Sequence, residues 1–399
     1  MDITMVGTGY LGATHAACMA ELGHRVIGID TDATKVEALN SGRSPFYEPG
    51  LDELLAKHTT TGRLRFTTDP AAASAARLHF LGVGTPQHPG SDEADLSALH
   101  AAVASLVPHL EGEHTLVGKS TVPVGTARAL AATLPPTITL LWNPEFLREG
   151  HAVADTLRPD RIVIGGDGDI LDELYAPLGR PIIHTDWETA ELVKGAANAL
   201  LATKVSFING VATMCDAVGA NITELSRALG LDHRIGPHFL AAGLGYGGGC
   251  LPKDTRSFRH QAASLGAEST AHLLQAVDAI NTERRTRVID QIRALQPQRV
   301  AILGAAFKPG SDDVRDSPGL AIAAALDCDV AVADPLAPGY LDVDCALDGA
   351  DVVVLATAWP DYVNLDPEWA KKKVRSPRII DGRYALDATA WRQAGWIVM

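Results

Sequence analysis

Residues 5–23, "MVGTGYLGATHAACMAELG", join the end of a strand-like run to the start of a helical pattern through a glycine-rich turn. The turn contains Gly7, Gly9 and Gly12, and the next strand-like run, "RVIGID" (25–30), ends at Asp30. Glycines at this spacing, between a strand and a helix, allow a tight turn and the close approach of a pyrophosphate to the free N–H groups of the helix. The stretch therefore predicts a βαβ unit that binds a dinucleotide.

The acidic residue after the second strand indicates which dinucleotide is bound. A carboxylate at Asp30 can accept hydrogen bonds from both ribose hydroxyls and would repel a 2′-phosphate, so we expect NAD rather than NADP. Tyr10 and Leu11 belong to the same turn and are expected to contact the cofactor. We expect Lys35 near the adenosine, although a solvated lysine on the surface of a helix explains it almost as well.

Strand–helix alternation extends outward from this stretch and divides the chain into three regions of an α/β protein. Residues 1–185 contain six apolar runs between helical patterns, which predicts an N-terminal NAD-binding Rossmann domain with a mostly parallel sheet. Residues 186–295 carry two long helical patterns, at 189–220 and 269–295, typical of a packing spine and a dimer interface. Residues 296–399 predict a second Rossmann-like, doubly wound domain, without the glycine fingerprint and therefore for a different ligand.

The composition is that of a soluble globular protein, with 46% hydrophobic and 21% charged residues among 399. The net charge of −14 argues against a nucleic acid or an anionic membrane as the main partner. No apolar stretch is long enough to span a bilayer, and no signal peptide is expected before the first strand. Five scattered cysteines favour a reducing, cytoplasmic compartment, and no histidine has the spacing of a metal ligand.

One cysteine stands apart in "GYGGGCLPKD" (245–254). Pro252 suits the first turn of a helix, so Cys250 is expected at a helix N-terminus, where the thiolate is stabilised. Lys253 would act in the same direction, and Asp254 would at least complement the helix dipole. We interpret the glycines before Cys250 as room for a bulky substrate, and the other four cysteines as small buried hydrophobic residues.

Further polar candidates lie on the long helix and in loops after predicted strands. Lys194 and Asn198 are one helical turn apart and could stabilise a developing alkoxide, although such a pair alone is more often a solvent-facing one. The loops "GKSTVPVGT" (118–126) and "WNPEFLREG" (142–150) supply Thr121, Glu145 and Glu149, each of which alone could equally be a cap or turn residue. In the last region, where Ser317 is expected to cap a helix, the candidate cations are Lys308, Arg315 and Arg383.

Ten segments, in order over essentially the whole chain, resemble the UDP-glucose/GDP-mannose dehydrogenase family. Several are weak alone, but their ordered combination is highly specific. They are "GTGYLG", "GTP" (84–86), "KSTVPVGT", "NPEFLREG", "PDRIVIG", "AELVKGAANALLATKVSFIN", "RIGPHFL", "GYGGGCLPKD", "AAFKPGSDDVRDSP" and "DGR" (381–383). Within the family, "GYGGGCLPKD" is most similar to the members that oxidise UDP-glucose.

The resemblance implies a four-electron oxidation of a sugar C6 alcohol to an acid, with two NAD molecules used in turn. Cys250 would trap the aldehyde as a thiohemiacetal and then carry the thioester, while Lys194 and Asn198 stabilise the oxyanions. Asp254 would pair with Lys194 or with an activated water. Glu145 would assist hydrolysis of the thioester, and Thr121 would help to place the water.

The resemblance also assigns binding residues and a quaternary state. Arg234 would reach the nucleotide sugar across a homodimer formed by the central helices. The implied cofactor contacts are Gly7, Gly9, Tyr10, Leu11, Gly12, Asp30, Lys35, Thr85, Pro86, Thr121, Glu149, Lys253 and Arg315. The implied substrate contacts are Glu145, Phe146, Leu147, Arg148, Lys194, Asn198, Arg234, Phe239, Gly245, Tyr246, Gly247, Lys308 and Arg383. The chain departs from the family at Gly210, where an acidic residue is common, and we expect this to affect helix packing or a subunit contact and not the chemistry. The long C-terminal tail of some relatives is also absent, which leaves assembly beyond a dimer open.

Three alternatives stay open. The same chemistry could act on GDP-mannose or on a UDP-N-acetylhexosamine. A two-electron hydroxyacid or phosphogluconate-type dehydrogenase shares the layout, but it does not need a cysteine such as Cys250. A catalytically silent NAD-binding regulator is a remote possibility, which the presence of Cys250, Lys194 and Asp254 disfavours.

Overall fold

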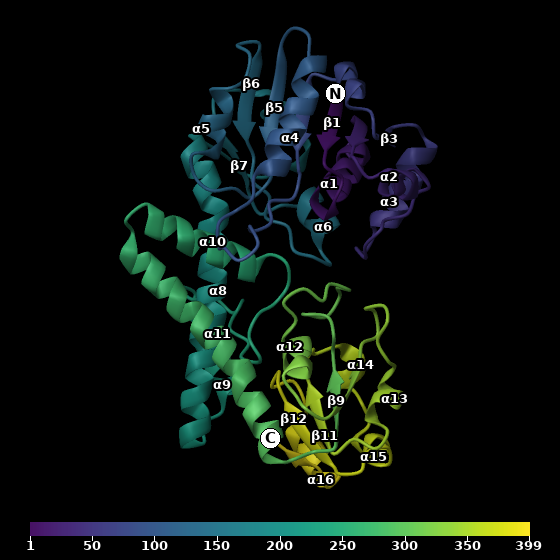
Figure 1. Cartoon of the computed structure of the whole chain (residues 1–399), viewed down its shortest axis with the longest axis vertical. Helices are drawn as coiled ribbons and strands as arrows, with labels where there is room; N and C mark the ends of the chain where they lie inside the picture. The colour runs from purple at the N-terminus through teal and green to yellow at the C-terminus, as the bar shows by residue number, and fades with distance from the viewer. The chain divides into compact units, whose positions relative to one another are not determined.

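The computed structural model describes all 399 residues, which divide into two compact units, Met1–Ala197 and Asn198–Met399 (Figure 1). The first unit is an eight-stranded sheet with helices, and the second combines a five-stranded sheet with the helices that precede it and those between and after its strands. Helix α8 (Trp187–Val218) begins in the first unit and ends in the second. The structure thus has the predicted class, two Rossmann-like sheets and a long helix in the middle of the chain.

The first sheet has the strand order β3-β2-β1-β4-β5-β6-β7-β8. Its first six strands run parallel in the order of dinucleotide-binding folds, and β7 pairs antiparallel with β6 through Trp142 and Gly165. The strands are β1 (Asp2–Val6), β2 (Arg25–Ile29), β3 (Leu64–Thr67), β4 (Leu78–Leu81), β5 (His114–Gly118), β6 (Ile138–Trp142), β7 (Ile162–Gly165) and β8 (Ile182–Thr185). The helices before α8 are α1 (Tyr10–Glu21), α2 (Ala33–Asn40), α3 (Leu51–Thr60), α4 (Ser97–Leu106), α5 (Thr126–Ala131), α6 (Ala152–Leu157) and α7 (Ile170–Tyr175).

Two apolar cores cover the two faces of this sheet. Ile3 and Met5 of β1 face a core shared with α1 and α3, whereas Val6 joins a second core with α4 and α5. This split follows from the strand geometry, since successive side chains point to opposite faces. Strands β3 and β8 were not expected from the sequence, because each has only four residues with polar side chains among the apolar ones.

The second sheet has five parallel strands in the order β10-β9-β11-β12-β13, the other common doubly wound order. Ser317 accepts a hydrogen bond from the Leu320 amide and caps α12, as the sequence predicts. The strands are β9 (Arg299–Leu303), β10 (Asp329–Ala333), β11 (Val352–Leu355), β12 (Arg378–Asp381) and β13 (Ile397–Val398). The helices between and after them are α12 (Pro318–Ala324), α13 (Val343–Leu347), α14 (Pro360–Val363), α15 (Pro367–Lys371) and α16 (Ala388–Gln393).

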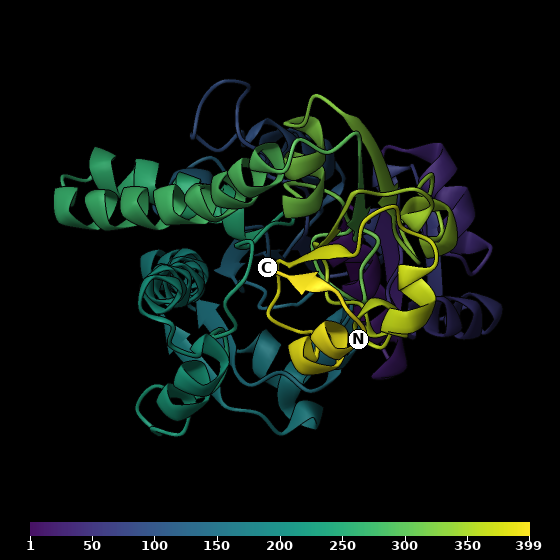
Figure 2. The same ribbon diagram turned by 90° about the horizontal axis from the view of Figure 1, so that it is seen from below.

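Three helices precede the second sheet: α9 (Ile222–Gly230), α10 (Leu251–Ser264) and α11 (Glu268–Ala294). Figure 2 looks along α8, with α11 running beside it, and the Ser206 hydroxyl of α8 donates to the Val277 carbonyl of α11 at 2.7 Å. Gly210 faces the same neighbour with room to spare, because an added Cβ would meet only Ile280, at 4.0 Å. These helices share a compact unit with the second sheet, and the separate helical domain at 186–295 stays a prediction.

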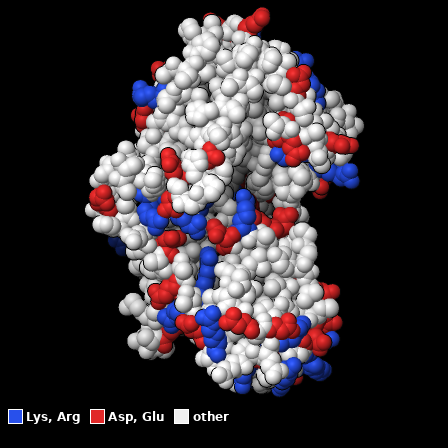
Figure 3. All heavy atoms as spheres, viewed as in Figure 1, with Lys and Arg blue, Asp and Glu red and all other residues white.

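Two surface properties bear on the expectations. None of the helices, α8 included, has the length and apolarity needed to cross a membrane. On the face shown in Figure 3, acidic and basic side chains are intermingled. None of the five cysteines forms a disulfide, but the expectation that four of them are buried is wrong for Cys345, which is exposed, and Cys328 is only partly buried. Cys345 lies within the short helix α13, and Cys328 directly precedes β10.

Candidate active site

The glycine turn after β1 leaves the N-terminus of α1 open. Gly7 has a φ of +84°, and a Cβ there would come within 2.9 Å of the Val83 amide nitrogen. A Cβ at Gly12 would overlap the Gly7 carbonyl oxygen, whereas one at Gly9 would meet nothing within 4 Å. Packing therefore requires the first and third glycines, and the space beside Gly9 fits a pyrophosphate over the helix N-terminus.

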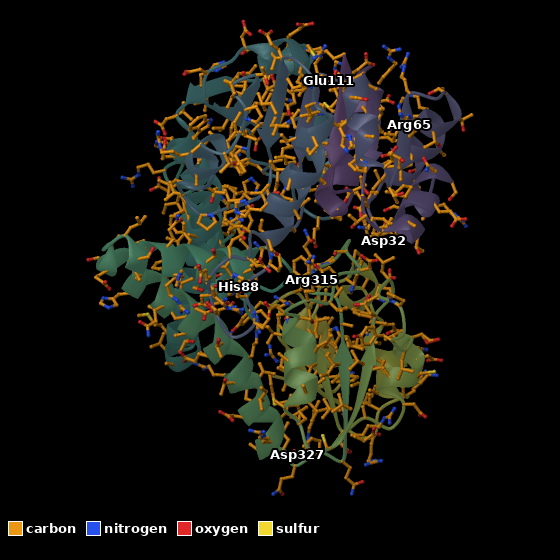
Figure 4. All side chains as sticks on the ribbon, turned by 45° about the horizontal axis from the view of Figure 1, so that its top comes forward. Asp32, Arg65, His88, Glu111, Arg315 and Asp327 are labelled. Atoms are coloured by element: carbon orange, nitrogen blue, oxygen red, sulfur yellow. The ribbon has the colours of Figure 1, made fainter.

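Asp30 lies directly after β2 and is held from several sides. Its carboxylate accepts hydrogen bonds from the Thr8 amide at 2.7 Å, the Thr8 hydroxyl at 3.0 Å and the Asp32 amide at 3.1 Å. Lys35 forms an ion pair with it at 3.0 Å, so this lysine lies beside the predicted ribose site. Burial acts to raise the pKa of Asp30, but these hydrogen bonds outweigh it and leave the pKa lowered. Figure 4 labels Asp32, which caps α2 just beyond.

The ends of β4 and β5 are tied together. The Thr85 hydroxyl donates to the Thr121 carbonyl at 2.6 Å, and the Ser120 hydroxyl donates to the Val83 carbonyl at 2.6 Å. Thr85 is buried, so its hydroxyl serves this contact between loops. The structure therefore brings the predicted cofactor residues Thr85 and Thr121 next to each other at the carboxyl ends of neighbouring strands, where α/β sheets bind ligands.

Glu145 and Lys194 form an ion pair of 2.8 Å, with only 14% and 5% of their side chains exposed. The Leu147 amide donates to the other carboxylate oxygen of Glu145 at 2.5 Å. The Phe146 ring between them lies 3.7 Å from the Arg161 guanidinium and 6.0 Å from the Lys194 ammonium. Glu145 and Lys194, predicted from separate motifs, thus form a contact. The cation–π contact of Arg161 with Phe146 was not predicted from the sequence.

Lys119 is a buried cation that the sequence reasoning passed over, although it stands in the "GKS" that follows β5. Its ammonium donates to Asn143 Oδ1 at 2.8 Å, and the Tyr175 hydroxyl donates to the same oxygen at 2.7 Å. Burial lowers the pKa of Lys119 to about 7, an effect that the charge of Glu145 partly opposes. A lysine directly after a buried strand was the available signal, because such a position rarely reaches solvent.

Glu191 connects α8 to the loop that carries Thr121. It is buried on α8 and accepts hydrogen bonds from the Gly125 amide at 2.7 Å and the Ala127 amide at 2.5 Å, at the start of α5. Burial raises the pKa of Glu191, and the two amides oppose this. Since Lys194 lies one turn further along α8, Glu191 fixes the helix that carries Lys194 to the Thr121 loop.

Two further predicted contacts, Arg148 and Glu149, lie in the 142–150 loop. The Arg148 guanidinium binds both oxygens of Asp155 in α6, at 2.6 and 3.0 Å. Arg148 is exposed, so a role in substrate binding would require this pair to open. Glu149 is partly buried.

In the second unit, Cys250 is the N-cap residue of α10 and is exposed, as expected for a thiol at a helix N-terminus. Asp254 in the first turn is buried and has two donors. They are the Asn198 amide group and the Lys253 ammonium, each at 2.6 Å. The structure thus joins Asn198 of α8 to the helix of Cys250 through Asp254. Lys253, expected to favour the thiolate, is paired with Asp254.

Packing within the second unit requires the glycines at 245, 247 and 248, whereas at Gly249 an added Cβ would meet only the end of the exposed Arg315 side chain. Our interpretation of the glycines as room for a substrate stays a prediction. Gly245 and Gly248 have φ values of +91° and +85°, and an added Cβ on any of four glycines would collide with the surroundings. The atoms met are Asn281 Oδ1 at Gly245, the Asp316 carbonyl at Gly247, the Phe307 ring at Gly248 and the Arg315 guanidinium at Gly249. The turn is therefore pressed against α11 and the loop after β9.

Long-range hydrogen bonds fix the backbone of this turn. Asn281 of α11 accepts from the Tyr246 amide at 2.8 Å and donates to the Tyr246 carbonyl at 3.1 Å, and Arg285 donates to that carbonyl at 2.7 Å. Arg383, after β12, donates to the Gly245 carbonyl at 3.1 Å and has an Nη2 without a hydrogen-bond partner. Burial, with the charge of Arg285, lowers the pKa of Arg383 to about 10. An unpaired guanidinium nitrogen beside the turn suits an anionic ligand.

The remaining predicted residues of this unit are spread over its loops. Arg234 is exposed and pairs with Asp232 at 2.6 Å. Phe239 is 37% exposed with a φ of +62°, a strained conformation that often marks a binding segment. Lys308 lies 5.4 Å from the Phe307 ring, after β9. Arg315, labelled in Figure 4, binds Asp313 at 2.7 Å.

Comparisons with known proteins match the chain in three consecutive parts. The UDP-glucose/GDP-mannose dehydrogenase family's NAD binding domain matches residues 1–179, its central domain matches 188–283 and its UDP binding domain matches 301–388.

Individual relatives extend over nearly the whole chain. The UDP-glucose 6-dehydrogenase of Rhizobium meliloti (strain 1021) is 40% identical, over 98% of this chain and 97% of its own length. The structure of a UDP-glucose dehydrogenase from Pyrobaculum islandicum is similar with a TM-score of 0.90 and 37% identity, covering 100% of this chain and 97% of the other. A UDP-D-ManNAc dehydrogenase structure from Pyrococcus horikoshii has a TM-score of 0.89 at 26% identity, covering 100% and 98%.

Proposed function

Because this chain belongs to the UDP-glucose/GDP-mannose dehydrogenase family and is an NAD-dependent dehydrogenase, we propose that it oxidises UDP-glucose at C6 to UDP-glucuronate. The names of the relatives support the substrate, and the third matching part is a UDP binding domain. The observation that carries the proposal is Cys250, an exposed thiol at the N-cap of α10, beside the buried Asp254. An alcohol dehydrogenase that stops at the aldehyde has no need of such a thiol.

The residues of the chain divide the reaction between them. When bound, NAD accepts a hydride in each of the two oxidations. The Cys250 thiolate adds to the C6 aldehyde carbon, and the resulting thiohemiacetal is oxidised to a thioester that water hydrolyses to the acid and the free thiol. Over both steps, one alcohol, one water and two NAD⁺ give one carboxylic acid, two NADH and two protons.

Three polar side chains support these steps. The ammonium of Lys194 and the amide of Asn198 stabilise the oxyanions formed when the thiolate and later the water attack the C6 carbon. Glu145 accepts a proton from the attacking water, and its ion pair with Lys194 holds the carboxylate in place. Asn198 uses one amide hydrogen on Asp254, which leaves the other for the oxyanion.

A homodimer formed through α8 is part of the proposal. Leu200, Phe207, Met214 and Val218 lie on one face of the helix, and between 58% and 78% of each side chain is exposed. An unpaired apolar face of this kind on a dehydrogenase of this family suits a second copy of the chain, across which Arg234 would reach the substrate. We also infer a cytoplasmic location, since none of the five cysteines forms a disulfide, and a supply of UDP-glucuronate for polysaccharide synthesis.

The test is to count NADH formed per sugar with UDP-glucose, GDP-mannose and UDP-N-acetylmannosamine. We expect two NADH per UDP-glucose and no free aldehyde. One NADH with release of the aldehyde would refute the covalent route. Turnover of UDP-N-acetylmannosamine alone would instead favour the second candidate substrate, which the similarity to the Pyrococcus horikoshii structure supports.

A further inference from the structure

Glu48 is a buried carboxylate in the loop between α2 and α3, with only 6% of the residue exposed. The loop is rigid at this point. Pro49 follows, Gly50 adopts a φ of +80° at the N-cap of α3, and the Leu51 amide donates to the Glu48 carbonyl at 3.2 Å. A carboxylate removed from water is costly unless hydrogen-bond donors surround it, so its partners indicate its role.

The donors to Glu48 come from two distant parts of the first unit. The Tyr10 hydroxyl and the Gly150 amide both donate to Oε2, the latter at 2.8 Å, and the Val153 amide approaches Oε1 at 3.3 Å. The Gly150 amide is also 3.0 Å from the Tyr10 hydroxyl. A closed network thus joins Tyr10, Glu48 and Gly150.

One end of this network is the dinucleotide site. Tyr10 is the first residue of α1 and directly follows Gly9, the glycine with open space beside it. The Tyr10 ring packs against Phe46, with the ring centroids 4.9 Å apart. Burial, together with the hydrogen bond to Glu48, raises the pKa of Tyr10, so its hydroxyl stays protonated and donates. A pyrophosphate over the first turn of α1 would therefore lie next to Tyr10, the residue that donates a hydrogen bond to Glu48.

The other end is the segment that carries Glu145. Gly150 closes the loop after β6, and the same loop places Glu145 in its ion pair with Lys194. Arg148, between them, is fixed to Asp155 of α6. Only four residues separate Glu145 from Gly150, and one of them is held by an ion pair. A shift of the Gly150 backbone should therefore also shift Glu145.

We propose that Glu48 is a positioning residue that couples occupation of the dinucleotide site to the placement of Glu145. Through Tyr10 and Gly150, the bound cofactor holds the 143–150 segment in the arrangement in which Glu145 meets Lys194. A purely structural carboxylate would anchor this segment to the same degree with and without cofactor. The kinetic part of the inference rests on the proposed activity, but the exchange measurement below does not.

The first measurement is hydrogen–deuterium exchange in peptides covering 143–157 of the full chain, with and without NAD. In the unsubstituted protein, we expect NAD to slow exchange in these peptides about threefold or more. In Glu48→Gln, which keeps one acceptor oxygen but loses the second, the NAD-dependent part should disappear. Tyr10→Phe, which keeps the ring against Phe46, should give the same loss. Slowing by NAD that persists in both variants, or that is absent from the unsubstituted protein, would overturn the proposal.

The second measurement separates positioning from stability. We expect kcat of Glu48→Gln to fall about threefold to thirtyfold, the usual range of coupling through a side-chain network, with a smaller change in KM for NAD. Asp351→Asn is the matched control, because Asp351 is also a largely buried carboxylate that accepts hydrogen bonds from two backbone amides, at Gln298 and Arg299, far along the chain. A Glu48→Gln enzyme that loses melting temperature like the control but keeps its kcat would refute the inference. Absence of NADH formation from any sugar by the unsubstituted protein would refute the proposed function and leave the exchange result to decide on Glu48.

Discussion

Buried charges in this protein are each held by at least one partner from a distant part of the sequence. Asp254 accepts hydrogen bonds from the Asn198 amide group and the Lys253 ammonium. Lys119 donates a hydrogen bond to Asn143. Such groups keep a defined orientation, because breaking a buried pair leaves an uncompensated charge. The catalytic candidates are therefore pre-organised, and substitutions at them should affect chemistry more than binding.

Cys250 gives the clearest prediction of this kind. Cys250→Ala should abolish acid formation, whereas Cys250→Ser should form an ester that hydrolyses slowly, because an alkoxide is a poorer leaving group than a thiolate. Intact-mass analysis after incubation with UDP-glucose and NAD should show the Ser variant carrying the sugar nucleotide.

Cys345→Ser is the matched control, since Cys345 is the other exposed thiol but lies within α13 and not at an N-cap. This variant should keep full activity. Full activity of Cys250→Ala would end the covalent mechanism.

The buried side chain of His79 should make the free energy of unfolding fall in acid. It is fully buried on β4, with Nδ1 2.7 Å from the Thr4 hydroxyl and Nε2 2.9 Å from His114 Nδ1. Burial, with the charges of His114 and Arg77, lowers the pKa of His79 to about 3. Since an unfolded histidine binds a proton below about pH 6.5, the stabilisation is complete above that pH and is lost as the pH falls toward 3.

Urea unfolding at two pH values tests this prediction. Between pH 7 and pH 4.5, the full chain should lose about 2–3 kcal/mol more than a His79→Gln variant. His100→Gln, at an exposed position, should behave like the unsubstituted protein. Equal pH dependence of all three proteins would show that His79 takes up a proton without unfolding.

At the level of elements, α8 has two apolar faces with different uses. Ala202, Ile208, Ala212 and Cys215 are buried within the second unit, while the stripe from Leu200 to Val218 is exposed. A 3.6-residue period predicts one buried stripe on a surface helix, so a second one calls for another partner. The helix therefore suits both a packing spine and a subunit interface.

Phe207→Asp tests the second face. If the proposed dimer forms through this stripe, a charge in its middle should give a monomer, as measured by light scattering coupled to gel filtration. Leu265→Asp is the control, because Leu265 is 64% exposed at the end of α10 but lies off the stripe. Dissociation by both changes, or by neither, would contradict an interface centred on α8.

At the level of the whole molecule, the chain forms two units with separate cores. Apolar clusters cover both faces of the first sheet, and two others cover the second sheet. In each sheet, the candidate ligand residues follow the carboxyl ends of the strands. We therefore expect the dinucleotide and the nucleotide sugar to depend on different residues for their affinity.

A pair of variants measures this independence by calorimetry. Asp30→Asn should weaken NAD binding about tenfold or more, through loss of a charged hydrogen bond to the ribose, and should leave UDP binding unchanged. Lys308→Met should do the reverse, because it removes a cation that is expected to contact the nucleotide sugar. The unsubstituted protein should bind NADP at least about tenfold more weakly than NAD. Loss of both ligands in either variant would contradict separate sites.

The sequence by itself determined the features that depend on neighbouring residues. The glycine turn with Asp30, the long α8, the N-cap position of Cys250 and the Ser317 cap all follow from local backbone rules that a short stretch contains. The resemblance to a family over the full chain then supplied roles for these positions. The short strands β3 and β8 were not predicted, because half of the four residues in each are polar and interrupt the apolar run.

Only the tertiary structure decided which distant groups meet. Glu145 forms an ion pair with Lys194, and Asp254 accepts a hydrogen bond from Asn198. Glu48 accepts hydrogen bonds from Tyr10 and Gly150. Each of these contacts joins residues dozens of positions apart in the sequence. It also decided that the glycines before Cys250 serve close packing against α11 and the loop after β9. The physical reason is that the elements packed around a side chain decide whether it is buried and which hydrogen-bond donors it meets. A local sequence pattern does not specify which elements those are.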